Sequence, residues 1–397
     1  RFFFPARFPR KDVIGSPWIH GIFDKKEQSV QPYNKQLKGN TCVFGVPGAG
    51  KTRLLELLML QSAYRNEALF IIDPKGDREL ELSARKAAAH HGRPFYLFHP
   101  ARHSESVRMD PMKFFGLVTE LADRIALLTE DANPSFENFS WESIERLCNA
   151  LIYIQKRPTI RSLKSFLDLG TITLTKQVIE EYYKTNDAEK YQELLASSKG
   201  MSEEEYVEIL INAYLTVELS KREIAVDGIV NLYRHPKEHF AKMIINITPI
   251  FTQLTSGPLA KLLSPDPLDD DERPIIDARH VIDKKAIFYL GLSNMSNNKV
   301  ASAVGSMFLT ELATVAGHDY DFGDQEKISD RTIQIMCDEC NEIVQGAGGK
   351  AIVKLLNKGR GVGYRLTICT QTLNDWVDGM GSKDKALQVM GLTNNAI

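Results

Sequence analysis

The sequence has little of what marks several common classes of protein. It contains only five cysteines, an odd number scattered over 397 residues, which argues against a disulfide framework and suits a reducing compartment such as the cytoplasm. Its net charge is −2, so no overall positive field indicates nucleic acid, although a local basic lining would not change the total. It also lacks a run of about 18 consecutive apolar residues, so we expect the chain as given to be soluble. What remains is a globular chain, 43% hydrophobic and long enough for two domains or one domain with a large insertion.

Two clusters of cysteine or histidine side chains lack the further ligands that a metal ion needs. Cys337 and Cys340 form a single CxxC pair, and no second pair stands at the spacing of a zinc site. Four histidines fall between residues 90 and 103, but the first two close a helical pattern, ELSARKAAAHHG, where cations complement the helix dipole. We therefore expect these histidines to be solvated and neither cluster to bind a transition metal.

A glycine-rich octapeptide, GVPGAGKT, fits the spacing G-x-x-x-x-G-K-[ST] of a phosphate-binding P-loop. The run before it is apolar and rich in strand formers, and the run after it has leucines at helical spacing, so the motif has the strand, loop and helix context that it requires. Backbone N–H groups would approach a polyphosphate, Lys51 would contact the β- and γ-phosphates, and the Thr52 hydroxyl would bind Mg²⁺. The predicted nucleotide-binding residues are Gly45, Val46, Pro47, Gly48, Ala49, Gly50, Lys51, Thr52 and Arg53.

Short apolar runs bounded by turn residues or charges recur along the chain and predict buried strands. Helical patterns lie between them, which is the alternation expected of an α/β domain with a parallel sheet. The predicted strands fall within residues 41–44, 69–72, 95–98, 286–290, 333–336 and 366–369.

Residues 116–251 contain no convincing strand and are predicted to be helical. Ser140 is a candidate N-cap of one helix, and Pro158 suits the first turn of the next. Between residues 176 and 223, eleven acidic residues stand against six basic ones, so this surface is unsuited to gripping DNA. Solvated helix faces and a protein-facing surface both remain open.

A second acidic motif, IQIMCDE, ends at Glu339 and supplies what a P-loop alone lacks for hydrolysis. It predicts a buried strand that emerges into two consecutive carboxylates. Asp338 would hold Mg²⁺ through water, and Glu339 would orient and deprotonate the attacking water. The pair favours an ATPase over a GTPase, because no guanine-reading NKxD follows.

Two further segments contribute candidate side chains. A predicted helix, KAIVKLLNK, leads into a glycine-rich turn that contains Arg360, and a strand then ends at Gln371. An amide at the carboxyl end of a strand lies where open α/β sheets bind ligands, so Gln371 is a candidate sensor of the γ-phosphate. Arg360 could act as an arginine finger on a neighbouring subunit, or could simply compensate the dipole at a helix end.

The segment IIDPKGD, from Ile71 to Asp77, places an acid, a proline, a lysine and a glycine directly after the second predicted strand. That position is again on the ligand-binding edge of the sheet. Physical chemistry alone predicts a turn here and nothing more.

The order GVPGAGKT, IIDPKGD, IQIMCDE, GRGVGYRLTICTQT resembles that of the conjugative coupling proteins of the TraD/TraG type, within the larger group of hexameric RecA-like motor ATPases. The DPKGD segment and the arrangement of GR and TQ are the specific parts, because many families share the P-loop. The resemblance spans about residues 40–380. It implies a RecA-like P-loop NTPase domain with a twisted, mostly parallel sheet and an inserted all-α domain.

The resemblance also implies a division of the chain and a set of roles. The catalytic residues would be Lys51, Glu339, Arg360 as arginine finger and Gln371 as sensor, with Thr52 and Asp338 as Mg²⁺ ligands. The divisions would be an N-terminal segment (1–39), a first part of the nucleotide-binding domain (40–115), the inserted all-α domain (116–251) and a second part of the nucleotide-binding domain (252–397).

The resemblance implies an ATP hydrolase that uses ATP and Mg²⁺, forms a hexamer of identical chains and is anchored at the cytoplasmic face of the bacterial inner membrane. Its partners would be single-stranded DNA, with duplex DNA also open, the relaxase of the relaxosome and the type IV secretion channel proteins. The aromatic and basic segment RFFFPARFPRK would then lie next to a membrane span, although an ordinary domain edge explains it equally well.

Two alternatives remain open at this point. One is a DNA translocase of the chromosome-segregation or repair type, and the other is an adaptor ATPase that recruits protein cargo to a secretion system. Loops near residues 294–299 and 374–385 are candidates for lining a pore, because each follows a predicted strand on the ligand-binding edge.

Overall fold

The computed structural model describes residues 39–126, 128, 134–292, 297–344 and 347–397. The chain forms two compact units, each described here by itself. Unit 1 consists of Arg1–Met109 and Asp270–Ile397, and unit 2 of Asp110–Asp269. The predicted N-terminal segment, 1–39, lies outside the described residues except for Gly39.

Unit 1 is built on a seven-stranded sheet in the order β3-β6-β2-β7-β8-β1-β9. Every pairing in it is parallel, so the carboxyl ends of all seven strands meet at one edge. Each strand predicted from the sequence is present, and the predicted α/β class with a mostly parallel sheet is confirmed. The strands are β1 Thr41–Phe44, β2 Ala68–Asp73, β3 Phe95–Phe98, β6 Ile287–Gly291, β7 Ile333–Cys337, β8 Tyr364–Thr370 and β9 Asn395–Ala396.

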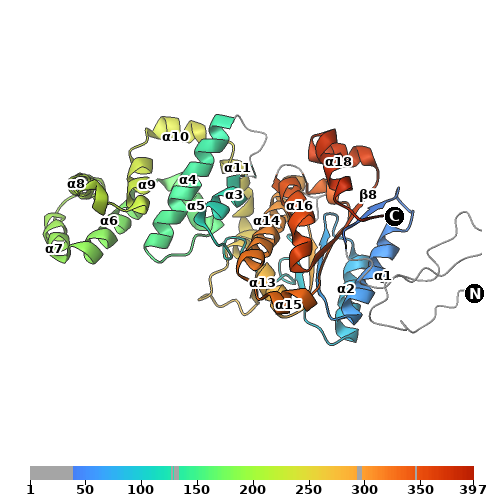
Figure 1. Ribbon diagram of the computed structural model, residues 1–397. Coiled ribbons are helices and arrows are strands. Elements are labelled where there is room, and N and C mark those ends of the chain that lie inside the picture. Colours follow the sequence, from blue (N-terminus) through green and yellow to red (C-terminus); the bar gives the residue numbers. More distant parts are fainter. Residues whose placement is uncertain (1–38, 127, 129–133, 293–296, 345–346) are drawn as a thin grey trace, which may run out of the picture. The chain divides into compact units, whose positions relative to one another are not determined.

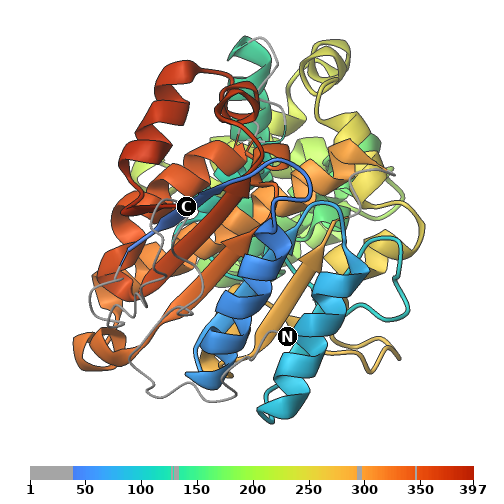
Figure 2. The same cartoon turned by 90° about the vertical axis from the view of Figure 1, so that its right-hand side faces the viewer.

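Helices cover both faces of this sheet, because side chains alternate between the faces along each strand. Leu69 and Ile71 of β2 pack in one core with helices α1 (Lys51–Tyr64) and α2 (Arg78–His90), which lie in front of the sheet in Figure 2. Phe70, between them in sequence, faces the other way and contacts Phe308 of α14 (Asn298–Phe322), with ring centroids 5.7 Å apart. The central strands β2, β6 and β7 are therefore buried on both faces, which explains their continuous apolar runs.

The remaining helices of unit 1 connect the strands or follow the last long one. They are α13 Ala278–Asp283, α15 Gln325–Asp330, η3 Cys340–Glu342, α16 Ala347–Lys358, η4 Gly359–Val362, α17 Leu373–Met380 and α18 Lys383–Gly391.

Helix α14 is long and apolar enough, by length and composition, to cross a membrane, although it contains no run of about 18 consecutive apolar residues. Its most apolar window is 83% buried within the protein, as expected for the core helix of an α/β unit. The described residues contain no other helix that meets this test.

The candidate pore loops are not both loops. Of residues 374–385, all but 381 and 382 lie in α17 and the start of α18, because Thr372 and Asp375 form a capping box that begins a helix directly after β8. Of residues 294–299, the first three lie outside the described residues, Asn297 caps α14, and the last two begin that helix.

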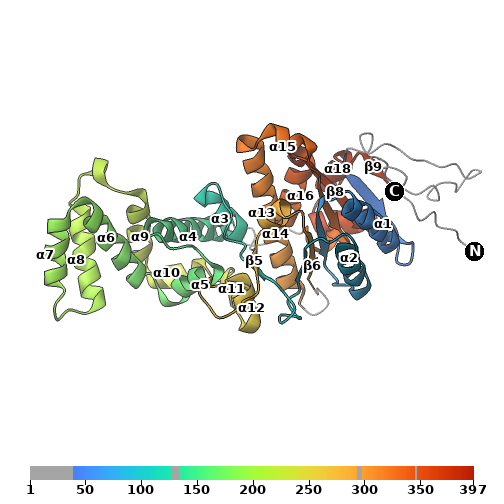
Figure 3. The ribbon, with the colours of Figure 1, turned by 90° about the horizontal axis from the view of Figure 1, so that it is seen from below.

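Unit 2 contains only helices in its described part, as the absence of strand patterns predicted. Helices α6, α7 and α8 pack together in it (Figures 1 and 3), and the rings of Tyr182 in α6 and Tyr214 in α8 lie 5.1 Å apart. The helices are α3 Val118–Ala126, α4 Pro134–Tyr153, α5 Ile160–Leu169, α6 Ile172–Asn186, α7 Ala188–Ser197, α8 Glu203–Leu215, η2 Leu219–Lys221, α9 Ile224–Tyr233, α10 Lys237–Met243, α11 Thr248–Leu254 and α12 Gly257–Leu263.

Two helix starts in unit 2 differ from the prediction. Helix α4 begins at Pro134, so Ser140 is a buried residue in its interior and not its N-cap. Thr159 caps α5 through a capping box with Ser162, so Pro158 precedes the helix instead of opening it. For α5, Thr159 offers a better cap than the residue chosen from local sequence, whereas α4 simply extends further toward the N-terminus than Ser140.

The chain leaves unit 1 and returns to it through two adjacent short strands. These strands, β4 Arg108–Met109 and β5 Ile275–Ile276, pair in parallel as a separate two-stranded sheet. The Arg108 guanidinium also donates to the carbonyl oxygen of Arg273, with Nη2 at 2.8 Å. Bringing both crossing points together allows unit 2 to be an insertion that leaves the parallel sheet intact.

Candidate functional site

The glycine-rich loop follows β1 and opens α1, as the P-loop interpretation requires. Gly48 and Gly50 adopt φ values of +82° and +95°, a left-handed region that a side chain would strain. Gly50 is the residue that precedes α1, so the loop ends at the positive end of the helix dipole. The loop from Val46 to Gly50 is exposed. Its backbone is therefore shaped and accessible for an anion.

The side chains at the start of α1 have distinct partners. The Lys51 ammonium donates to the carbonyl oxygen of Gly45 and lies 3.4 Å from that of Val46. Thr52 is half-buried in the first turn. The Arg53 guanidinium points away to Glu56, at 2.7 Å, and is 76% exposed. Lys51 thus closes over its own loop, whereas the side chain of Arg53 is engaged one turn along the helix.

The two predicted carboxylates follow β7 at the same edge of the sheet. The Asp338 amide donates to the carbonyl oxygen of Ile72 at 3.0 Å, and its Oδ1 accepts from the Glu339 amide at 3.0 Å. Glu339 has φ 44° and ψ 50°, a left-handed conformation that costs a non-glycine residue about 1–3 kcal/mol. It is only 7% exposed. Such a strained, buried carboxylate is typical of a functional site.

Asp338 carries a strongly perturbed carboxyl group. Its pKa is raised from the ordinary 3.8 to about 6. Burial is the largest cause, and the neighbouring carboxylates of Asp73 and Glu339 add to it. The Lys51 charge opposes the rise, which puts the phosphate loop and the acid within electrostatic reach of each other. The site therefore holds more negative charge than its ammonium groups balance.

Gln371 directly follows β8, and its amide Nε2 donates to Glu339 Oε1 at 3.0 Å. The strands β7, β8 and β1 are consecutive in the sheet, which is why their carboxyl ends bring Glu339, Gln371 and Lys51 to one place. Local sequence indicated each of these residues separately. The strand order is what assembles them.

Arg360 lies at the opposite edge of the sheet from the other predicted site residues. It lies in η4, which precedes β8, and it is exposed. β8 runs for seven residues before it reaches Gln371, a rise of about 20 Å. Within the described ranges its guanidinium makes no hydrogen bond or ion pair. This placement keeps Arg360 away from the phosphate loop of its own chain.

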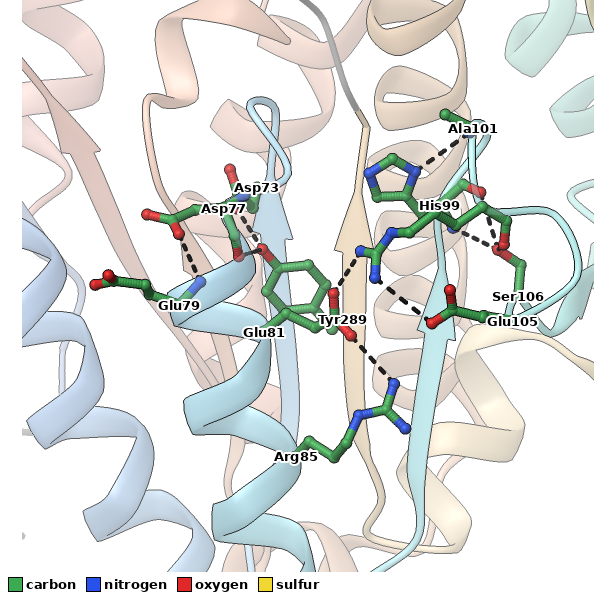
Figure 4. Close-up of polar contacts among 11 residues, drawn as sticks. Asp73, Asp77, Glu79, Glu81, Arg85, His99, Ala101, Glu105, Ser106 and Tyr289 are labelled. Carbon is green, nitrogen blue, oxygen red and sulfur yellow. Dashed lines mark hydrogen bonds and ion pairs between the residues drawn. The ribbon is translucent and has the colours of Figure 1, made fainter.

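The sequence pointed to the DPKGD segment without indicating what its residues do. Asp73, 2% exposed, accepts from the amides of Lys75 at 3.0 Å and Asp77 at 2.6 Å, and so forms the turn. The Tyr289 hydroxyl, directed at this turn from β6 in Figure 4, donates to Asp73 and is 2.8 Å from the Asp77 carbonyl oxygen. Burial raises the pKa of Asp73, and these hydrogen bonds only partly oppose that effect.

Lys75 extends from this turn to the predicted catalytic residue. Its ammonium forms an ion pair with Glu339 Oε1, the same oxygen that accepts from Gln371. The signal available in the sequence was the position of Lys75 after a strand on the ligand-binding edge. The contact itself depends on β2 lying next to β7, which local sequence does not reveal.

Helix α2 is fixed beside the turn by a second polar network, also drawn in Figure 4. Glu81 accepts from Arg85 at 3.1 Å and from Arg102, and burial, which favours the neutral acid, is outweighed by these bonds so that its pKa is lowered. His99 is buried close by, its Nδ1 accepting from the Ala101 amide at 3.2 Å, and burial lowers its pKa. These groups form hydrogen bonds and ion pairs that support the packing of α2 on β3 and β6.

The donor set fits Mg²⁺ bound together with a phosphate. Within the described ranges no three His, Cys, Asp or Glu side chains converge as a metal site, and the cysteines are buried free thiols. Mg²⁺ usually takes one or two carboxylates together with phosphate oxygens and water. The Thr52 hydroxyl and the Asp338 carboxylate supply such oxygens, and the excess of negative charge around Asp338 suits a divalent cation.

Comparison with known proteins finds the same architecture. No family model and no curated protein matches the sequence. Among solved structures, the bacterial conjugative coupling protein TrwBdeltaN70 in its unbound monoclinic form has a TM-score of 0.55 at 13% identity, covering 92% of this chain and 69% of that one. TrwB with a non-hydrolysable ATP analogue has a TM-score of 0.52 at 14% identity, covering 90% and 70%. TrwB with ADP and Mg²⁺ has a TM-score of 0.50 at 13% identity, covering 91% and 70%. The chain therefore has the α/β fold of the TrwB type of coupling protein, as the order of its motifs predicted.

Proposed function

We propose that this chain binds ATP with Mg²⁺ and hydrolyses it. The observation that carries the proposal is the meeting of Lys51, Asp338, Glu339 and Gln371 at one edge of the sheet, linked by the contacts described above. Four side chains of these types, from three consecutive strands, are what a P-loop hydrolase requires.

Each residue has a role that its surroundings support. The backbone N–H groups between Gly45 and Thr52, with Lys51, bind the phosphates at the start of α1. Thr52 and Asp338 would hold Mg²⁺, which neutralises charge on the phosphates. Glu339 accepts a proton from the attacking water, and Gln371 orients the glutamate through its amide.

We further propose that hydrolysis drives DNA transport by a coupling protein of a type IV secretion system. Two observations support this: the order of the four sequence motifs, and the shared fold with TrwB, which its structures name a conjugative and plasmid coupling protein. Relaxase-bound single-stranded DNA would be the cargo, and the inner membrane the location. The position of Arg360, away from its own phosphate loop, supports a ring of identical chains in which it completes a neighbour's site.

The composition of unit 2 favours a second candidate, an adaptor that recruits protein cargo. Eleven acidic residues against six basic ones between residues 176 and 223 make that surface better suited to a protein than to a phosphate backbone. In that case ATP hydrolysis would serve assembly, and DNA would not change its rate.

The test is the steady-state rate of ATP hydrolysis by the wild-type chain and by Lys51→Ala. We expect activity in the wild type, its loss in Lys51→Ala, and a higher wild-type rate when single-stranded DNA is added. A Lys51→Ala chain as active as the wild type would refute nucleotide hydrolysis at this site. Wild-type activity that neither single-stranded nor duplex DNA changes would favour the adaptor.

A further inference from the structure

The general base proposed above is held in place by two donors in this structure. Oε1 of Glu339 accepts hydrogen bonds from both the Lys75 ammonium and the Gln371 amide. An ionised carboxylate has two oxygens with about four lone-pair directions, so two donors on Oε1 fix the orientation of the group and leave Oε2 as an acceptor. A base accepts a proton from water only when one of its oxygens lies within hydrogen-bond reach of that water, so this fixed orientation decides whether Glu339 can act. The structure therefore shows a restrained glutamate.

The charges around the pair hold Lys75 in its ionised form. Partial burial acts to lower the pKa of the ammonium, but the hydrogen bond and charge of Glu339, with the charges of Asp338 and Asp73, outweigh it and raise the pKa. The two groups also differ in freedom. The Lys75 side chain is 49% exposed, whereas that of Glu339 is 9% exposed and follows a strained backbone.

The backbone of Lys75 is held in its turn, whereas its side chain is half-exposed. Its amide is bound to Oδ1 of Asp73, and the turn is further fixed by Tyr289 from β6. The flexible four-carbon stem can thus leave the carboxylate without any change in the turn. Breaking such a half-exposed pair costs about 1 kcal/mol or less, which is small enough to be reversible during turnover.

We propose that Lys75 is a positioning residue that withholds Glu339 from the attacking water, so that release of this ion pair controls the rate of hydrolysis. This inference rests on the proposed ATPase function and adds a regulating residue to the same site. In the restrained state Lys75 and Gln371 together hold Oε1. In the released state Gln371 alone contacts the carboxylate, which can then turn so that one of its oxygens reaches the water. The rate is then the rate of the chemical step multiplied by the fraction of released sites.

The experiment compares kcat and KM for ATP in the wild type, Lys75→Met and Lys75→Arg. Methionine keeps the length of the side chain and removes its charge and donors. We expect Lys75→Met to raise kcat by about twofold to sixfold with KM changed by less than about twofold, which corresponds to a pair of about 1 kcal/mol or less. Lys75→Arg keeps a cation and should retain a rate near that of the wild type.

Two controls separate this effect from a general change in the fold. Lys86→Met removes an exposed lysine of α2 and should leave kcat unchanged. Lys75→Met combined with Glu339→Gln should be no more active than Glu339→Gln alone, because the gain acts through the carboxylate. Melting temperatures of the two single variants and the double variant test the pair without any activity, and we expect their shifts not to be additive.

The outcomes distinguish the two proposals. If the wild type is no more active than Lys51→Ala, the proposed function fails. If the wild type is active but Lys75→Met has an unchanged or lower kcat, the restraint by Lys75 is refuted while the ATPase stands. A lower kcat with a raised KM would mean that Lys75 binds the nucleotide instead.

Discussion

The two sides of the candidate site are built in opposite ways. The phosphate loop is exposed, with Val46 60% exposed, and is held by local contacts such as the 3.1 Å hydrogen bond from the Ala49 amide to the Val46 carbonyl oxygen. The acidic side is buried, and its Lys75–Glu339 pair joins residues 264 positions apart. In the proposed function, binding would use backbone groups shaped by an octapeptide, whereas catalysis would use charged groups that only the folded sheet brings together. The exposed loop therefore costs the fold little free energy, whereas the buried carboxylates repel one another and the fold must hold them together.

The largest effect is expected when one residue of each side is substituted in turn and the two variants are compared. Glu339→Gln keeps the size of the side chain but removes the base, so we expect kcat to fall by at least about 10²-fold while nucleotide affinity stays within a fewfold of the wild type. Lys51→Ala, by contrast, should have a lower affinity for the nucleotide. The measurements are steady-state turnover and titration with a fluorescent ATP analogue. Equal loss of affinity in both variants would show that the two sides do not divide binding from chemistry.

A smaller effect should appear in stability, because the acidic side is repulsive. Asp338 binds its proton more tightly in the folded chain, so folding stability decreases as pH rises from about 4 to about 6, and the cost is fully present above that. The substitution Asp338→Asn removes this cost, because asparagine carries no charge. We expect this variant to be more stable than the wild type by about 1–3 kcal/mol at pH 7, with no gain at pH 3.5, while Mg²⁺-dependent hydrolysis is lost.

The same carboxyl group makes ligand binding depend on pH. Asp338 must lose its proton to bind Mg²⁺, so affinity for Mg²⁺-nucleotide should weaken by up to about tenfold per pH unit below pH 6. Chemical unfolding at the two pH values and titrations between pH 5 and 8 check both statements. An Asp338→Asn chain less stable than the wild type at pH 7 would contradict the repulsive character of this side.

The smallest expected effect tests the support behind the acidic side. Tyr289→Phe removes the hydroxyl that donates to Asp73, leaving a buried carboxylate with one fewer donor. We expect a loss of about 1–2 kcal/mol in the free energy of unfolding at pH 7, measured with denaturant. Because the turn that carries Lys75 would loosen, kcat should rise slightly. The substitution Tyr96→Phe in the neighbouring strand β3, where the hydroxyl bonds His280 at 3.0 Å, is a matched control that should leave kcat unchanged.

Much of unit 1 could be predicted from the sequence, for a reason visible in its strands. The central strands β2, β6 and β7 are buried on both faces, so runs such as residues 69–72 are continuously apolar and have few other interpretations. Helix starts were harder. Ser140 is a good cap by composition, but the chain before it is also helical, so its hydroxyl became an interior group of α4. Capping depends on where the helix begins, and packing can override the local preference.

The candidate site was predictable residue by residue but not as a site. Lys51, Asp338, Glu339 and Gln371 each belong to a pattern of adjacent residues with a mechanism of its own. Lys75, Asp73 and Tyr289 belong to none, because their importance comes from β2 lying between β6 and β7. Strand order in a parallel sheet depends on crossovers of many residues, which no local window contains.

The sequence by itself determined a glycine-rich loop that opens a helix, a pair of carboxylates after a strand and the α/β class, because these depend on short segments whose backbone conformation and burial follow from adjacent residues. The tertiary structure alone decided that Lys75 holds Glu339, that the pKa of Asp338 rises to about 6, and that Arg360 lies far from its own loop. These properties arise from charges and donors brought together across strands, and such interactions depend on distance in space and on burial, not on distance along the chain.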